Sequence, residues 1–225
     1  MQELSLVQKI IVWAVPVLLA ITVHEVAHGW VALRYGDTTA KQAGRLTLNP
    51  IKHVDAIGTI LVPGLLLAMG SGFLFGWAKP VPVNFMRLNN PKRDMVYVAI
   101  AGPATNLIMA FIWGLAGYVA QFLPNAVAEP LVLMSVAGIF INAILMLVNL
   151  IPLPPLDGGR VAVGLLPNKL AHAYSKLEPY GLFIMIALLA TGMLGTILWP
   201  PLSALGSFMA NLFSRRFIQL FSLIT

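Results

Sequence analysis

The chain has 225 residues, of which 59% are hydrophobic and only 10% are charged. Soluble domains are typically about a quarter charged, so this composition predicts a polytopic membrane protein with room for roughly four to six spans. The absence of cysteine excludes disulfides, thiolate metal ligands and a cysteine nucleophile. The formal net charge is +6, but the basic residues are spread through several loops, which favours membrane topology over a nucleic-acid partner.

The hydropathy pattern predicts an all-α polytopic membrane protein. We expect a first span from about Val7 to Leu33, which is retained because it lacks a small-residue cleavage site. Residues 34–55 are polar and contain a short strand-like alternation before a turn. Further apolar segments, in chain order, are 57–77, 95–123, 131–151 and 179–198.

Two domain-level expectations follow from this pattern. Residues 1–200 are expected to form one membrane-embedded domain. Residues 201–225 are mixed in character and are expected to form a C-terminal interfacial amphipathic segment.

The basic residues predict the orientation of the spans. Eleven of the fourteen Lys and Arg residues lie in the loops 34–55, 79–94 and 160–178, whereas the loop 123–130 has none. By the positive-inside rule, the three basic loops are cytoplasmic. Two of them flank 57–77, whose glycine and proline residues favour a re-entrant segment that enters and leaves at one face. A full crossing is the alternative.

The first span contains the motif His24-Glu25-Val26-Ala27-His28, with the only ionisable side chains between Ile10 and Leu33. Such groups cost several kcal/mol in a bilayer unless they are paired or coordinated, and they therefore mark function. Two histidines four residues apart share one helix face and can bind one metal ion, usually zinc, with the adjacent glutamate as general base. An accidental match is disfavoured because this span has no other polar face.

A catalytic zinc ion typically has three protein ligands. The best-placed third ligand is Asp157, which follows a proline-rich stretch and precedes two glycines that permit a tight turn. The alternative is an interfacial Asp157 beside the next arginine. Asp55 and Asp94 also border spans, but they adjoin basic residues and are interpreted as surface charges.

A second polar island, Gly102-Pro103-Ala104-Thr105-Asn106, lies inside the span 95–123. At 1.5 Å per residue, Asn106 and His24 are about 16 and 15 Å from the cytoplasmic ends of their spans. An asparagine at this depth could donate a hydrogen bond to the oxyanion of peptide hydrolysis. The alternative is a hydrogen bond between helices.

Together, these motifs resemble the site-2 protease family of intramembrane zinc metalloproteases, in its compact prokaryotic branch without PDZ or CBS domains. The third family motif is Asn149…Pro152…Asp157-Gly158, and the resemblance covers roughly residues 7–167. It implies that His24, His28 and Asp157 hold one Zn²⁺ per chain and that Glu25 is the catalytic base. It also implies that Asn106 contacts the substrate or the oxyanion.

The resemblance further implies a transmembrane helix core with a short β-hairpin, in which 39–55 and 79–85 supply strands that clamp an extended substrate. The role of Asn149 is left open. His53 and His172 lie in basic loops and are interpreted as surface or structural residues.

The expected function is an intramembrane zinc metalloprotease that cleaves transmembrane proteins or peptides in or near their membrane segments, as in regulated intramembrane proteolysis. We expect it in the cell membrane, in contact with the lipid bilayer, with the active site nearer the cytoplasmic side. A metal-ion transporter or channel and a lipid-directed zinc enzyme are the alternatives. The substrate and the oligomeric state do not follow from the sequence.

Overall fold

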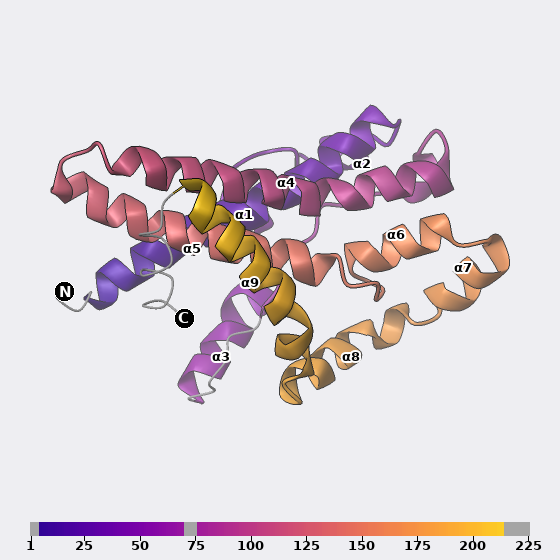
Figure 1. The fold of residues 1–225 in the computed structure, drawn as a ribbon. Helices are drawn as coiled ribbons and strands as arrows, with labels where there is room; N and C mark the ends of the chain where they lie inside the picture. Colours follow the sequence, from indigo (N-terminus) through magenta and orange to yellow (C-terminus); the bar gives the residue numbers. More distant parts are fainter. Residues whose placement is uncertain (1–4, 70–75, 214–225) are drawn as a thin grey trace.

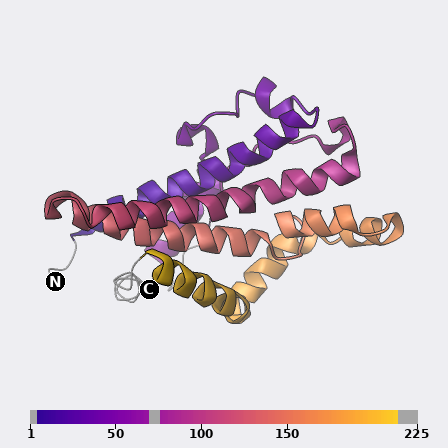
Figure 2. The same ribbon diagram turned by 45° about the horizontal axis from the view of Figure 1, so that its top comes forward.

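The computed structural model describes residues 5–69 and 76–213. Three long helices lie side by side: α1 (Leu6–Arg34), α4 (Pro91–Ala120) and α5 (Asn125–Asn149) (Figures 1 and 2). A fourth, α9 (Met193–Phe213), crosses α5 obliquely. These four helices are long and apolar enough to span a membrane. The expectation of an all-α polytopic membrane protein is confirmed.

Polar caps define where the helices begin. Ser5 forms a capping box with Gln8 at the start of α1. The Asp94 carboxylate is 1% exposed and accepts a hydrogen bond from the Asn90 backbone N–H at 2.7 Å, at the start of α4. Asp55 accepts hydrogen bonds from two backbone N–H groups of the next helical turn. Asp94 is therefore not a surface charge, because it is buried at the N-terminus of α4. Asp55 is half-buried and caps the next helical turn, which is compatible with its interpretation as a surface charge.

The segment after α5 is more broken than the hydropathy pattern predicts. It contains α6 (Asp157–Leu165), α7 (Asn168–Ser175) and α8 (Glu178–Ala190) before α9. The single span expected over 179–198 is wrong because Gly192, at φ +73°, separates α8 from α9. Helix α9 continues through residue 200, and residues 214–225 lie outside the described part of the chain. The interfacial segment over 201–225 stays a prediction.

The predicted β-hairpin is not found, since 39–55 and 79–85 are fully described and contain no strand. The first range forms α2 (Thr39–Gln42) and a 3₁₀ turn, η1 (Pro50–His53). The second forms neither helix nor strand over 79–83, where Pro80 and Pro82 have no N–H to donate to a sheet. The Lys79 N–H donates a hydrogen bond to the His53 carbonyl at 2.9 Å.

The segment 57–77 leaves the bundle through η2 (Ala56–Leu61) and α3 (Val62–Ala68), which points away from the core helices (Figure 1). Its two ends meet: the Trp77 N–H donates to the Gly58 carbonyl at 3.0 Å, and the Thr59 hydroxyl donates to the Trp77 carbonyl at 2.8 Å. This contact favours a re-entrant path. Residues 70–75 lie outside the described part of the chain, so re-entry stays a prediction.

Helices α6 and α7 are attached to the start of α4. The Lys92 ammonium donates to the Leu166 carbonyl at 2.5 Å and to the Asn168 side chain at 2.8 Å. Helix α6 also packs along α4. These contacts hold the first residue of α6, Asp157, against the bundle.

Candidate metal centre

Three side chains from two separate helices converge inside the bundle. His24 and His28 lie one turn apart on α1, and their Nε2 atoms are 3.0 Å apart. The Asp157 Oδ2 atom lies 3.3 Å from each of these nitrogens. His24 is 7% exposed. The structure therefore brings the three expected ligands together, and they form its candidate metal-binding group.

Hydrogen bonds on the far side of each imidazole orient the rings. The His28 Nδ1 atom lies 2.6 Å from the Val98 carbonyl, which can only accept, so this nitrogen carries the hydrogen. The His24 Nδ1 atom lies 2.5 Å from the Asn106 Oδ1 atom. In the neutral imidazoles, both Nε2 atoms then present lone pairs toward Asp157.

This donor set fits a zinc ion. Two bare nitrogens and a carboxylate oxygen face one another, and Asp157 Oδ2 is buried without a hydrogen bond from any described residue. Such an arrangement is repulsive unless a cation lies between the three atoms. Ligand atoms about 2.0 Å from a tetrahedral zinc ion stand about 3.3 Å apart, close to the separations found here.

Gly102 of α4 makes room for this centre. A Cβ atom at this position would stand 2.5 Å from His24 Cε1 and 2.6 Å from His24 Nε2, and would also collide with His28 Nε2. The motif glycine therefore allows α4 to pass directly behind the two rings. The close approach explains why Val98 and Asn106, one turn to either side, reach the histidines.

A tightly packed loop positions Asp157 at the start of α6. A Cβ on Gly158 would collide with the carbonyls of Leu150 and Ile151, and one on Gly159 would collide with the backbone of Pro154. The loop backbone thus rests directly on the first turn of α6.

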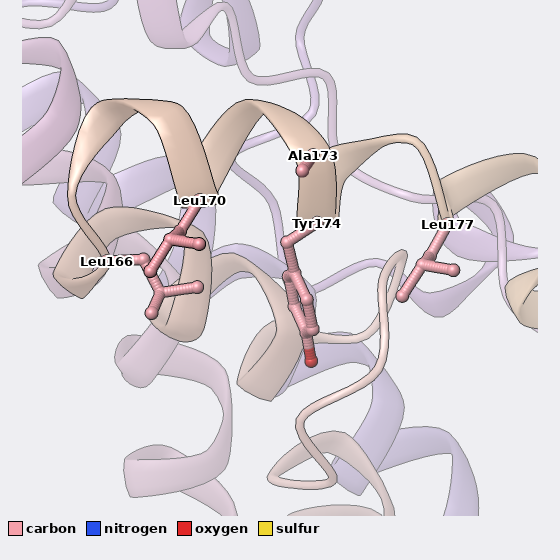
Figure 3. Close-up of a pocket in the computed structure, with 5 residues that line it drawn as sticks. All are labelled: Leu166, Leu170, Ala173, Tyr174 and Leu177. Carbon is pink, nitrogen blue, oxygen red and sulfur yellow. The ribbon is translucent and has the colours of Figure 1, made fainter.

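Helices α7 and α8 cover the same loop. The Tyr174 hydroxyl donates to the Pro152 carbonyl, and Gly181 lies against Pro154 without space for a Cβ. Tyr174 also lines an apolar pocket with Leu166, Leu170, Ala173 and Leu177 (Figure 3). This pocket contains none of the expected site residues, so it is separate from the metal centre.

The electrostatics favour an ionised Asp157. Burial raises the pKa of its carboxyl group, but His24 and His28, once their imidazoles are protonated and donate to it, outweigh burial and lower the pKa to about 2. A carboxylate that is anionic at neutral pH is ready to bind a metal cation.

Glu25 lies next to His24 on α1 and is held from outside the helix. Its Oε2 atom accepts a hydrogen bond from the Val81 N–H at 2.6 Å. Because the residues on both sides of Val81 are prolines, this is the only N–H between Lys79 and Val83. The segment 79–83 therefore lies against the carboxylate and directs the Val81 N–H at it.

The remaining predicted residues lie outside the ligand group. Asn106 is 0% exposed and contacts His24 rather than open space. His53 is buried and bonds the Thr47 carbonyl at 2.9 Å, a structural role, whereas His172 is exposed. The Asn149 amide bonds back to the Leu145 carbonyl on its own helix at 2.9 Å.

Sequence reasoning missed two residues of the site. Val81 acts through its backbone N–H, which leaves no signal in its residue type. Asn142 is a buried amide of α5 that contacts Asn106. Its position inside an otherwise apolar span was a signal that could have been used.

A membrane-spanning helical bundle with two histidines, an aspartate and an adjacent glutamate defines a class, the membrane-embedded metallopeptidases. The chain matches the model of peptidase family M50 over residues 12–192. It therefore belongs to this family, the site-2 proteases, and is a multi-pass membrane zinc metalloprotease.

Relatives in two bacterial groups are similar over most of the chain. Bacillus subtilis strain 168 YwhC, named as a candidate zinc metalloprotease, is 40% identical over 90% of this chain and 91% of its own length. Rip2 of Mycolicibacterium smegmatis, named in the same way, is 30% identical over 77% of this chain and 64% of its own length. Rip2 of Mycobacterium tuberculosis H37Rv is 27% identical over 88% of this chain and 78% of its own length. No solved structure matches the chain significantly.

Proposed function

We propose that this protein cleaves membrane proteins or peptides within or next to their transmembrane segments, as in regulated intramembrane proteolysis. The observation that carries the proposal is the position of the site. His24, Glu25 and His28 all lie on α1, a candidate span, and are completed by Asp157. A polar site of this kind within the membrane suits a substrate that is itself in the bilayer.

We further propose that the protein resides in the cell membrane with this site nearer the cytoplasmic face. His28 contacts Val98, which is only seven residues from the start of α4 at Pro91, or about 10 Å along the helix. That start carries Lys92 and Arg93, and the positive-inside rule assigns it to the cytoplasm. Water then has its shortest path to the site from the cytoplasm.

In the proposed mechanism, His24, His28 and Asp157 hold the zinc ion. When bound, zinc acts as a Lewis acid that polarises the attacking water and the scissile carbonyl. Glu25 takes a proton from the water as the water oxygen forms a bond to the carbonyl carbon. Glu25 then delivers that proton to the amide nitrogen as the C–N bond breaks, which releases an amine and a carboxylic acid.

The Val81 N–H has a defined part in these steps. A carboxylate that accepts one fixed backbone hydrogen bond on Oε2 keeps its orientation while Oε1 is available for the proton. The substrate must be locally unwound, because a continuous helix keeps its carbonyls in its own hydrogen bonds.

The test compares Glu25→Gln with wild type and with Glu129→Gln as a matched control. Glu129 is an exposed residue of α5 outside the metal centre. Purified proteins in liposomes are given transmembrane peptides and assayed for cleavage and for zinc content. We expect Glu25→Gln to keep zinc and lose cleavage, while Glu129→Gln keeps both.

The same liposomes test the transporter alternative. Zinc flux that continues in Glu25→Gln, together with no peptide cleavage by any variant, would replace the protease with a transport function. Cleavage by Glu25→Gln at the wild-type rate would remove Glu25 as the base.

A further inference from the structure

A chain of buried amides links α5 to the metal centre. Asn142 of α5 is 0% exposed, and its Oδ1 atom accepts a hydrogen bond from Asn106 Nδ2 at 2.9 Å. Asn106 Oδ1 in turn lies 2.5 Å from His24 Nδ1. We propose that Asn142 is a positioning residue for the zinc site and acts on His24 through Asn106.

Two backbone carbonyls set the direction of every hydrogen bond in this chain. The Gly138 carbonyl lies 2.8 Å from one end of the Asn142 amide and can only accept, so that end is Nδ2 and the other is Oδ1. The Ala20 carbonyl lies 3.3 Å from one end of the Asn106 amide and also can only accept, so that end is Nδ2. Asn106 must therefore present its oxygen to His24, which places the hydrogen on Nδ1 of that ring.

This arrangement gives Asn106 a different role from the expected oxyanion contact. Its amide has two hydrogens, and these are directed to Ala20 and Asn142. No hydrogen is left for an oxyanion, and the side chain is fully buried. What the amide can do is hold the His24 ring in the tautomer whose Nε2 binds metal.

Helix packing explains why Asn142 and Asn106 meet. One turn before Asn142, Gly138 lies against the Trp113 indole, with no space for a Cβ between them. Trp113 is two turns beyond Asn106 on the neighbouring antiparallel helix α4. This contact fixes the register of α4 and α5 and holds the two amides opposite each other.

Loss of Asn142 would free one end of the Asn106 amide. The buried N–H would then lack its acceptor, and the amide could turn toward another partner, carrying His24 out of position. Metal–ligand distances tolerate only about 0.2 Å of error, so a small rotation of the ring weakens zinc binding.

The experiment measures zinc affinity of the purified full chain by competition with a chelator, alongside thermal unfolding. The variants are Asn142→Leu, the smaller Asn142→Ala, Asn106→Ala and the double variant Asn106→Ala/Asn142→Leu. Ser135→Ala is the matched control: Ser135 is also 0% exposed, lies two turns earlier on the same face of α5, and bonds the carbonyl four residues back at 2.7 Å.

We expect both Asn142 variants to bind zinc about ten- to hundredfold more weakly than wild type. Ser135→Ala should stay within about twofold, and the double variant should be no weaker than Asn106→Ala, because residues acting along one path are not additive. Wild-type affinity in both Asn142 variants, or additive losses in the double variant, would overturn the proposal.

The inference rests on the proposed zinc site, and the experiment separates the two. No zinc in well-folded wild type would remove both. Weakened zinc binding in the Asn142 variants, with no peptide cleavage by wild type, would keep the positioning role and remove the proteolytic function.

Discussion

The substitution Gly102→Ala adds one methyl group and tests whether the close passage of α4 behind His24 and His28 shapes the metal centre. The added Cβ would stand 2.6 Å from His24 Nε2, whereas non-bonded atoms settle at about 3.5 Å. Either the ring or the helix must move by about 0.9 Å. Zinc–ligand distances tolerate about 0.2 Å, so we expect zinc affinity to fall about a hundredfold or more.

Zinc content and chelator competition on the purified protein measure this effect, with Gly195→Ala as the control. Gly195 lies in α9, and a Cβ there would meet nothing within 4 Å. Alanine favours a helix over glycine by about 1 kcal/mol, so Gly195→Ala should unfold at or above the wild-type temperature. Undiminished zinc affinity in Gly102→Ala would refute the reasoning, because the rings would then not depend on the missing side chain.

Two further predictions concern segments that support the site. Val81→Pro removes the N–H that donates to Glu25. Because one hydrogen bond to a charged group is lost, we expect the cleavage rate to fall about ten- to hundredfold while the zinc content stays unchanged. An unchanged cleavage rate would contradict this. Asp37 is buried, which raises its pKa, but hydrogen bonds from Thr39 and Asn84 outweigh burial and hold the pKa of its carboxyl group below the ordinary range. The ionised Asp37 carboxylate therefore stabilises the fold at pH values above the ordinary pKa of an aspartate. This contribution is lost as the pH falls through the lowered pKa. We expect Asp37→Asn to lower the melting temperature at pH 7 but not in strong acid; the same difference at both pH values would contradict this.

The residues of the candidate metal centre could be predicted because their signal is local. His24, Glu25 and His28 are close in sequence, stand alone in an apolar span, and need only a helix to share a face. Asp157 was found for a related reason, since a carboxylate after prolines and before two glycines stands out. The long spans were likewise recognisable, because a bilayer requires about 20 apolar residues whatever their neighbours are.

Local pattern was insufficient where a backbone partner decided the outcome. The strand-like alternation of 39–55 does not form a sheet, since the neighbouring segment 79–83 has prolines and uses its N–H groups on His53 and Glu25. The apolar stretch 179–198 is split because Gly192 takes a positive φ. Both outcomes depend on contacts or conformations that hydropathy does not encode.

The sequence by itself determined that this chain spans membranes, that it belongs with the site-2 proteases, and which residues could bind zinc, since these follow from composition, spacing and motif. Only the tertiary structure decided how those residues are held. The partners that orient His24, His28 and Glu25 lie on α4 or in 79–83, and Asn142 lies on α5. The directions of their hydrogen bonds exist only once the helices pack, because each is set by backbone carbonyls and N–H groups that every sequence has.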